Sequence, residues 1–312
     1  MRFVVIGPGG LGCLLAAALA ATGEHTVWLL DHDRQRAHQL TKQGIGITDG
    51  AEQHRWSIPA TTDPGDIAAA DCLLLCVKSH QAGAALDQAA PLLATTPLTV
   101  CFQNGIGHLE LLSRRLPQGR WAAGVTAQGA TLLGPGQVRR GGAGPTRIGF
   151  LHETPAQSAD RLRQVAAALT ASGIETEVVA DIRDQIWRKL LINVGINALT
   201  AIHDCTNGKL LDSVTARQRL TNAVQEAARV ATAIGIQLDD DPVAATLAVC
   251  RATAANSSSM RQDIHNRRRT EIDAINNAVV AEGQRLRIPM PENQALVREI
   301  KEIEKEYLSD ST

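Results

Sequence analysis

The chain has 312 residues, of which 44% are hydrophobic and 20% are charged, and its formal net charge at pH 7 is -1. This length suits about two domains, each with enough apolar side chains for a sizeable core. The balanced charge provides no bulk attraction to nucleic acid or to an anionic membrane surface, so neither is an expected partner.

The cysteines and the N-terminus indicate the compartment. None of the six cysteines forms a Cys-x-x-Cys pair, and several lie in apolar runs, where a free thiol behaves as a small hydrophobe. The apolar N-terminus resembles a signal peptide, but the glycine cluster at residues 7–10 interrupts it, and no stretch is long enough to span a bilayer. We expect a soluble, cytoplasmic protein with reduced thiols.

The N-terminal stretch predicts a strand, a tight turn and a helix. Residues 2–6 are an apolar run, and GPGGLG and the Ala-rich pattern LLAAALAAT follow. Glycines at GxGxxG spacing let the backbone approach a pyrophosphate, and the helix N-terminus offers it free N–H groups. A lone GxGxxG is a weak signal, but this strand and helix context makes it stronger. The predicted dinucleotide-binding residues in this loop are Gly7, Pro8, Gly9, Gly10, Leu11 and Gly12.

The second predicted strand, residues 26–30, ends at an acidic residue. Asp31 lies 19 residues beyond Gly12, where a carboxylate can bind the adenosine ribose 2′-hydroxyl of NAD. His32, Arg34 and Arg36 follow at once, and basic groups here can instead hold the 2′-phosphate of NADP. The residues by themselves leave both cofactors open.

Further apolar runs at residues 72–77, 98–102 and 121–125 predict a doubly wound parallel sheet, because helical or glycine-containing segments separate them. Lys78 and Asn104 each follow one of these strands, at the end where open α/β sheets bind ligands. Their simpler interpretations are a charged strand end and a turn. The glycine-rich residues 134–149 are expected to complete the sheet as a hairpin.

The second half of the chain is predicted to be helical. The pattern changes near residue 156, and one more strand-like run precedes a series of long Ala-rich helices. We place the boundary near residue 180, which gives domains 1–180 and 181–312. The strand is expected at residues 175–179, and the helices at residues 215–235, 242–257, 270–283 and 291–307.

The stretch from Ile186 to Leu210 carries the strongest chemical signal. Its apolar residues surround the whole helix, so the helix should be buried nearly all round. The polar residues Lys189, Asn193 and Asn197 are spaced four residues apart. Each step turns about the helix axis by only ~40° beyond a full turn, so the three side chains share one face. A lone helical lysine is usually a solvated surface group, and asparagine is a poor helix-interior residue. Here the flanks are apolar, so we predict a polar cleft in which the lysine polarises a carbonyl and the amides orient a substrate.

Two other polar features have default structural interpretations. The cluster at residues 256–260 is typical of a helix cap or kink, and Glu271 with Asp273 is typical of a surface charge pair at a helix start. The nine histidines show no metal-ligand spacing, so we expect no metal site. The candidate set we considered and disfavoured is His203, Asp204 and Cys205.

These motifs together resemble those of the ketopantoate reductase (2-dehydropantoate 2-reductase) family. The match runs in family order across nearly the whole chain, through GPGGLG, VKSHQ, FQNGIG, the WRKL helix, TNGKL, SSMRQD, TEID and PEN. The resemblance implies an N-terminal Rossmann-type doubly wound sheet followed by an all-helical C-terminal domain. It also implies NADPH-dependent reduction of 2-dehydropantoate to pantoate, a step toward pantothenate and coenzyme A.

The resemblance assigns roles to matching positions. Lys189 corresponds to the general acid, and Glu271 to a glutamate beside cofactor and substrate. Lys78, Asn104 and Ala130 correspond to positions near the nicotinamide nucleotide. The implied substrate ligands are Asn104, Asn193, Asn197, Asn207 and Ser259.

The sequence also departs from the family pattern. His32, flanked by Asp31 and Asp33, stands where the family usually has an arginine for the 2′-phosphate. Asn277 replaces a glycine and Arg140 replaces a histidine, without obvious mechanistic cost. The first departure leaves the preference between NADPH and NADH open.

Our first interpretation is a reductase in which Lys189 protonates the developing alkoxide, and Arg34 and Lys78 hold NADPH against repulsion from Asp31. NADP(H) is the expected cofactor and NAD(H) the alternative. The surplus of polar side chains predicts a pocket for the 4-hydroxyl of ketopantoate.

The alternatives are a D-2-hydroxy acid dehydrogenase for another branched 2-oxo acid and a non-catalytic dinucleotide-binding regulator. The regulator would not need the polar face formed by Lys189, Asn193 and Asn197. A homodimer remains open.

Overall fold

The computed structural model describes residues 1–238 and 240–308 of the chain. The chain folds into two structural units. The first unit comprises Met1–Gln103 and Glu110–Ile182, and the second comprises Asn104–Leu109 and the chain from Arg183 onward. The short segment Asn104–Leu109 therefore packs with a part of the chain far from it in sequence.

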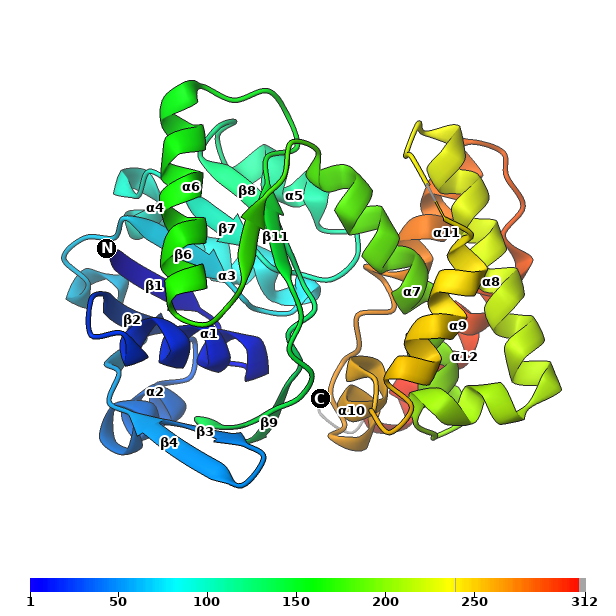
Figure 1. Ribbon diagram of the computed structural model, residues 1–312, viewed down its shortest axis with the longest axis horizontal. Coiled ribbons are helices and arrows are strands. Elements are labelled where there is room, and N and C mark those ends of the chain that lie inside the picture. Colours follow the sequence, from blue (N-terminus) through cyan, green and yellow to red (C-terminus); the bar gives the residue numbers. More distant parts are fainter. Residues whose placement is uncertain (239, 309–312) are drawn as a thin grey trace. The chain divides into compact units, whose positions relative to one another are not determined.

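The first unit is built around an eight-stranded sheet in the order β12-β11-β8-β7-β6-β1-β2-β5 (Figure 1). The strands from β8 to β5 are parallel, whereas β11 runs antiparallel to β8. Strand order reverses at β1, which pairs with both β2 and β6, so the predicted doubly wound sheet is confirmed. The strands are β1 (Arg2–Ile6), β2 (Thr26–Leu30), β5 (Ala60–Thr61), β6 (Cys72–Leu75), β7 (Thr99–Cys101), β8 (Trp121–Thr126), β11 (Thr146–Gly149) and β12 (Thr176–Val178).

Helices cover this sheet, which explains why its central strands are almost continuously apolar. The helices α1 and α6 contact each other and lie in front of the sheet in Figure 1. Phe3 and Val5 of β1 share a core with Leu15 of α1 and Val165 of α6. The helices of this unit are α1 (Gly10–Ala21), α2 (Arg34–Gln43), η1 (Pro64–Asp66), η2 (Ser79–Gln81), α3 (Ala82–Gln88), α4 (Ala90–Thr95), α5 (Leu109–Arg115) and α6 (Ala156–Ala171).

The glycine-rich segment departs from its prediction in part. Its last strand, β11, joins the main sheet, but β9 (Ala130–Gly134) and β10 (Gln137–Arg140) pair with β3 (Ile45–Asp49) and β4 (Glu52–Trp56) in a separate four-stranded sheet. Val138 pairs with Ile47, and both side chains are buried in the core of the first unit. Burial of these apolar side chains explains why β10 leaves the main sheet.

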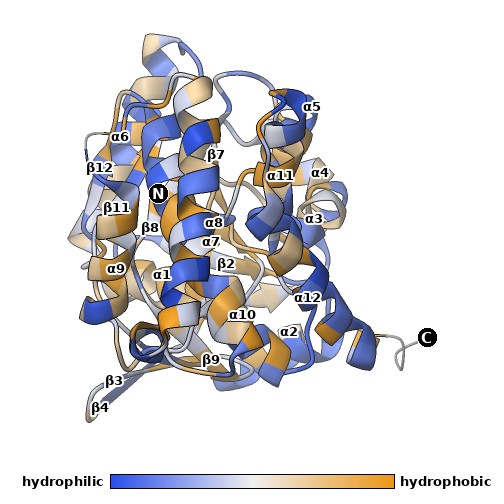
Figure 2. Cartoon of the chain, turned by 90° about the vertical axis from the view of Figure 1, so that its right-hand side faces the viewer, coloured by the Kyte–Doolittle hydropathy of each residue, from blue (hydrophilic) through white to orange (hydrophobic). Residues whose placement is uncertain are grey.

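The second unit is all-helical, as predicted. Its core gathers apolar residues from every long helix, and Figure 2 shows hydrophilic and hydrophobic residues alternating along α12, as expected for an amphipathic helix. Its elements are α7 (Ile182–Ile202), η3 (Asn207–Asp212), α8 (Val214–Ala233), α9 (Pro242–Ala252), α10 (Ser259–His265), α11 (Asn276–Arg285) and α12 (Pro291–Leu308).

Two predicted helices are shorter than expected because other groups bond their ends. The helix expected from residue 270 begins at Asn276, since Thr270 N–H donates to Glu304 (2.6 Å) and the Ala274 carbonyl accepts from Ile106 and Gly107. The helix expected to reach residue 257 ends at Ala252. The carbonyls of residues 254 and 256 accept N–H groups from the start of η3 instead.

All six cysteines are free, and four of them are buried. Burial raises the pKa of the Cys13 thiol to about 12, so this thiol stays protonated and unreactive at neutral pH. Within residues 1–238 and 240–308, no helix combines the length and the apolar character needed to cross a bilayer.

Candidate active site

The GPGGLG loop joins β1 to α1 and depends on its glycines. Gly7 has a φ of +93°, and a Cβ on it would lie 2.5 Å from Val77 Cγ1. A Cβ on Gly12 would lie 2.2 Å from the Gly7 carbonyl oxygen, so helix and strand approach each other as closely as glycine permits. A Cβ on Gly9, by contrast, would meet nothing within 4 Å. The loop therefore closes on itself at Gly7 and Gly12 and leaves open space at Gly9.

The start of α1 suits an anion. Gly9 caps the helix, and no side chain of residues 1–238 and 240–308 caps its first N–H groups. Uncapped N–H groups together with the helix dipole favour a phosphate, and the open space at Gly9 lets it approach the backbone. Gly10 lies against Ala130, since a Cβ on Gly10 would be 2.5 Å from the Ala130 carbonyl oxygen. These features fit the pyrophosphate of a dinucleotide.

Asp31, at the end of β2, is buried and already paired within the chain. Its carboxylate accepts from Arg36 Nε (2.6 Å), Arg36 Nη2 (2.5 Å) and the Asp33 N–H (3.2 Å). Its side chain has no exposed surface, whereas His32 and Arg34 are exposed. The accessible charges at this strand end are therefore the guanidinium of Arg34 and the partly exposed carboxylate of Asp33, with His32 3.5 Å from Asp31. Lys78 follows β6 and is partly buried at the N-cap of η2.

The polar face of α7 is formed by Lys189, Asn193 and Asn197. From Ile186 to Ala201 the rest of the helix is buried, as the sequence predicted, except for the partly exposed Arg188 and Ile192. Asn197 is 6% exposed, and Lys189 and Asn193 are partly exposed. None of the three side chains forms a hydrogen bond or ion pair with another residue that the structure describes. Their donors and acceptors remain available to a polar molecule.

Burial changes the acidity of this lysine. It lowers the pKa of Lys189 from 10.5 to about 8, and the negative charge of Glu271 opposes this by raising it. Lys189 is therefore still mostly protonated at pH 7 but releases its proton more readily than a solvated lysine. A pKa near the working pH suits a general acid.

Glu271 lies in a loop of residues 268–275, which we call the Glu271 loop. The prediction of a surface charge at a helix start is wrong for Glu271, because it is 4% exposed and precedes α11. Its Oε2 accepts from Asn104 Nδ2 at 3.0 Å, across 167 positions of sequence. Gly105, at φ +81°, makes this approach possible, since a Cβ there would lie 2.0 Å from the Ala274 carbonyl oxygen.

His108 is a polar residue of this region that sequence reasoning missed. It is 5% exposed, and its Nδ1 has no hydrogen-bond partner among the described residues. Burial lowers the pKa of His108 to about 4, against an opposing effect of Glu271, so the imidazole is neutral at pH 7. The available signal was its position, directly after the NGIG turn that carries Asn104.

Asn207 and Ser259 occupy different environments. Asn207 is buried, donates from Nδ2 to Thr253 Oγ1 (2.9 Å), and has a buried Oδ1 without a partner among described residues. Ser259 is exposed at the first position of α10. Its neighbour Ser258 caps that helix and accepts from Thr200 Oγ1 (2.7 Å). The amide is thus oriented for binding, whereas Ser259 faces solvent.

The remaining polar positions have structural roles. Asp204 accepts from Arg261 Nε (2.8 Å) and bonds to His265 Nε2 (2.5 Å), which ties α10 to the end of α7. Asn277, one departure from the family pattern, donates to Asp273 (3.2 Å). Arg140, the other, donates to Asp49 and to Gln128, each at 3.4 Å. No group of three or more metal-binding side chains occurs in the described parts of the chain.

A glycine-rich loop that suits a pyrophosphate and a partly exposed lysine with a lowered pKa are parts that hydride transfer requires. Together they define a dinucleotide-dependent oxidoreductase. Two family models match the chain: "Ketopantoate reductase PanE/ApbA" at residues 3–153 and "Ketopantoate reductase PanE/ApbA C terminal" at residues 181–304. The chain belongs to the ketopantoate reductase family.

Individual relatives agree with this membership. A 2-dehydropantoate 2-reductase of Halobacterium salinarum is 36% identical over 93% of this chain and 95% of its own length. One from Vibrio cholerae serotype O1 is 32% identical over 98% and 99%. Among solved structures, a PanE/ApbA family ketopantoate reductase from Ralstonia eutropha JMP134 has a TM-score of 0.87 at 29% identity, covering 98% and 99%. D-mandelate dehydrogenase with NADH and anilino(oxo)acetate has a TM-score of 0.90 at 26% identity, with the same coverage.

Proposed function

We propose that this chain reduces the ketone of 2-dehydropantoate to pantoate with NADPH, toward pantothenate and coenzyme A. The observation that carries the proposal is the face of Lys189, Asn193 and Asn197, available on a helix that is otherwise buried. The activity is the one named for the relatives from Halobacterium and Vibrio. Residues 1–180 would hold the dinucleotide, and the helical residues 181–312 would bind the substrate.

Lys189 acts as the general acid. A bound dinucleotide supplies the hydride that reaches the ketone carbon. As negative charge develops on the ketone oxygen, the ammonium of Lys189 stabilises it and then donates its proton. Glu271 supports this step, because its negative charge raises the pKa of Lys189 and keeps the ammonium protonated.

The amides give the substrate its orientation. Asn193 and Asn197 follow Lys189 on the same face of α7, and the unpartnered Oδ1 of Asn207 can accept from a substrate hydroxyl. Ser259 is proposed to contact the substrate carboxylate. Asn104 is held by Glu271 and is proposed to contact the substrate and the nicotinamide nucleotide. Lys78 and Ala130 are proposed contacts of the same nucleotide. A substrate analogue without the 4-hydroxyl would leave buried polar groups of the pocket without a partner and would therefore bind weakly. The pocket should thus select ketopantoate, which has this hydroxyl.

The preference for NADPH is supported by the end of β2. Arg36 compensates the charge of Asp31 within the chain, so the repulsion of a 2′-phosphate is reduced. Arg34 and His32 are exposed there and can pair with the phosphate. The glycines from Gly7 to Gly12, with Pro8 and Leu11, would hold the pyrophosphate.

The test of the substrate is kcat/KM for ketopantoate and for 3,3-dimethyl-2-oxobutanoate, which lacks the hydroxyl. We expect at least a roughly hundredfold preference for ketopantoate, since a site built for a hydroxyl rejects its analogue by up to about 10⁴. The preference should shrink in an Asn197→Ala variant. Equal efficiency on the two compounds would contradict the proposal.

A second candidate is a D-2-hydroxy acid dehydrogenase for another 2-oxo acid. The likeness to D-mandelate dehydrogenase, at a TM-score of 0.90, favours it. The same assay with phenylglyoxylate, the oxo acid of mandelate, separates the two. Higher kcat/KM for phenylglyoxylate than for ketopantoate would establish the second candidate in place of the first.

A further inference from the structure

Three side chains of α12 bond to the Glu271 loop. They are spaced three residues apart, and residues at this spacing lie next to each other on a helix surface. Their partners lie on both sides of Glu271 in the sequence, so the loop is held before and after that residue. We call this set the α12 clamp, and it consists of Lys301, Glu304 and Tyr307.

The middle contact is the most buried. Glu304 Oε1 accepts the Thr270 N–H at 2.6 Å, and both residues are buried. This bond fixes the backbone immediately before Glu271. A buried N–H that loses its partner costs about 1–3 kcal/mol, so the bond also keeps this stretch from continuing into α11.

The outer contacts fix the two ends of the loop. Lys301 Nζ pairs with Asp273 Oδ1 at 2.7 Å, and Tyr307 Oη donates to the Arg268 carbonyl at 3.0 Å. Asp273 also pairs with Arg269 Nη2 at 3.2 Å. The two ion pairs of Asp273 are partly exposed and so individually weak, whereas Tyr307 is buried. Together these contacts restrict the loop.

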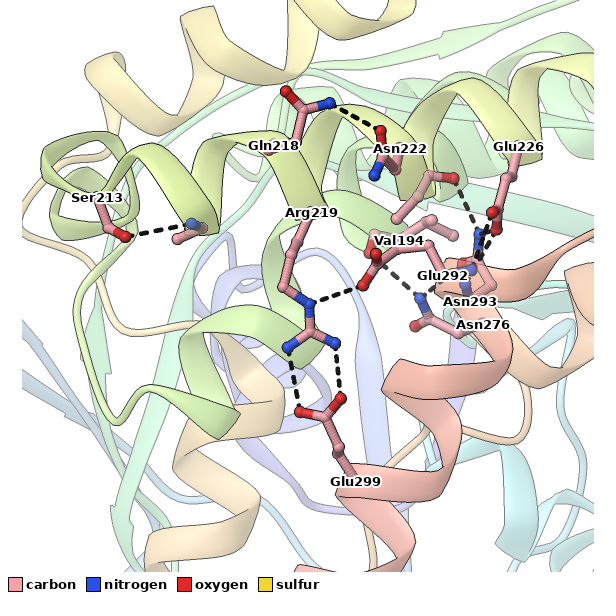
Figure 3. Close-up of polar contacts among 12 residues, drawn as sticks. Val194, Ser213, Gln218, Arg219, Asn222, Glu226, Asn276, Glu292, Asn293 and Glu299 are labelled. Carbon is pink, nitrogen blue, oxygen red and sulfur yellow. Dashed lines mark hydrogen bonds and ion pairs between the residues drawn. The ribbon is translucent and has the colours of Figure 1, made fainter.

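The opposite end of α12 is anchored in the core of the second unit. Glu226 of α8 is buried and accepts the N–H groups of Glu292 (2.9 Å) and Asn293 (3.0 Å), as Figure 3 shows. Asn293 Oδ1 accepts from Asn276 Nδ2 (3.0 Å), which also donates to the Val194 carbonyl of α7 (3.2 Å). The helix is thus fixed to α7, α8 and α11, and can act as a rigid support for the loop.

We propose that Lys301, Glu304 and Tyr307 are positioning residues that hold the Glu271 loop, and with it the Glu271–Asn104 hydrogen bond, in the geometry that the reaction needs. The proposal rests on the proposed function only in that Lys189 is the proton donor. The charge of Glu271 acts on Lys189 and also on the neutral His108. If the loop loosens, Glu271 moves away, and the pKa of Lys189 falls further.

The test measures the pKa of Lys189 directly, by competitive acylation of the full chain over a pH series, with the Lys189 peptide quantified by mass spectrometry. Glu271→Gln should lower this pKa. Lys301→Met and Tyr307→Phe should lower it in the same direction, by about half a unit or more. Removing the positive charge of Lys301 would by itself raise the pKa of Lys189, so the sign of the shift distinguishes positioning from direct electrostatics.

Two further variants complete the design. Lys301→Arg keeps the ion pair and should retain the wild-type value. Lys305→Met removes an exposed lysine of the same helix, which pairs with Glu302, and should change nothing. Thermal melts confirm that each variant is folded. Lys301 is partly exposed, and Tyr307→Phe removes only a hydroxyl, so both variants are expected to fold.

The outcomes separate the two proposals. A wild-type Lys189 pKa in folded Lys301→Met and Tyr307→Phe, or an unchanged pKa in Glu271→Gln, would overturn the clamp. Absence of turnover on every 2-oxo acid would overturn the proposed function, while the labelling result would stand by itself.

Discussion

The GPGGLG loop and the Glu271 loop illustrate two ways to build a site. The first is contiguous in sequence, and its backbone and glycines define its shape. The second is assembled from distant segments, since Glu271 bonds to Asn104 across 167 positions and is held by α12. A site made of backbone depends on the space that side chains leave open, whereas the proposed proton-donor site depends on charged side chains from distant segments being held in place. Substitutions in either loop should therefore disturb one function and leave the other intact.

The largest expected effect is at the centre of the side-chain site. Lys189→Ala should lower turnover by roughly 10² to 10⁴, the usual range for loss of a positioned acid. Dinucleotide binding, followed by fluorescence titration, should persist, because the nucleotide loop is built separately. Lys42→Ala, an exposed lysine in the last turn of α2, is the control and should keep full turnover. Turnover of Lys189→Ala within a few-fold of wild type would end the assignment.

The sequence predicted the contiguous features well, and the reason is physical. The strands β1 and β2, the glycine loop and the polar face of α7 follow from local periodicity, which neighbouring residues determine. Lys189, Asn193 and Asn197 share a face because of helix geometry alone.

Features that depend on distant partners were not predictable in this way. Nothing near Glu271 indicates that Glu304 and Asn104 bond to its loop and delay the start of α11. The pairing of β10 with β3 and the burial of His108 likewise depend on tertiary packing. Asp31 and Arg36, which bond to each other, are only five residues apart. Their spacing did not reveal this bond, because it suits an Asp31 that binds the cofactor as well as an Asp31 that pairs with Arg36.

The backbone site can be broken at Gly9. A Cβ there meets nothing in the chain, so Gly9→Ala should fold with an unchanged melting temperature. The methyl group would occupy the space in which a pyrophosphate approaches the backbone, so dinucleotide affinity should fall about thirtyfold, or ~2 kcal/mol. Gly142→Ala, where a Cβ also meets nothing, is the matched control. Unchanged affinity in Gly9→Ala would exclude the loop as the pyrophosphate site.

The preference between NADPH and NADH tests the charged residues at the end of β2 in the first unit. Wild type should favour NADPH over NADH by at least about tenfold, because a charge-assisted contact contributes about 1.5–3 kcal/mol. Arg36→Ala would leave the charge of Asp31 uncompensated and should shift the preference toward NADH. The measurement is kcat/KM with each cofactor. Equal or higher efficiency with NADH in the wild type would mean that Asp31 binds the ribose diol.

The smallest effect tests the electrostatics of the side-chain site, and its sign follows from the pKa of Lys189. The reduction needs the protonated lysine, so kcat/KM should be constant below the pKa of about 8 and fall as the pH rises through it. Glu271 raises that pKa, so its removal should move the fall to lower pH.

The most direct test of the account is therefore the pH dependence of kcat/KM for ketopantoate reduction, in wild type and in Glu271→Gln. The account predicts an alkaline limb near pH 8 in the wild type and a limb at lower pH in the variant. An alkaline limb that is absent, or that keeps the same pKa without Glu271, would contradict the claim that Lys189 donates the proton under the control of Glu271.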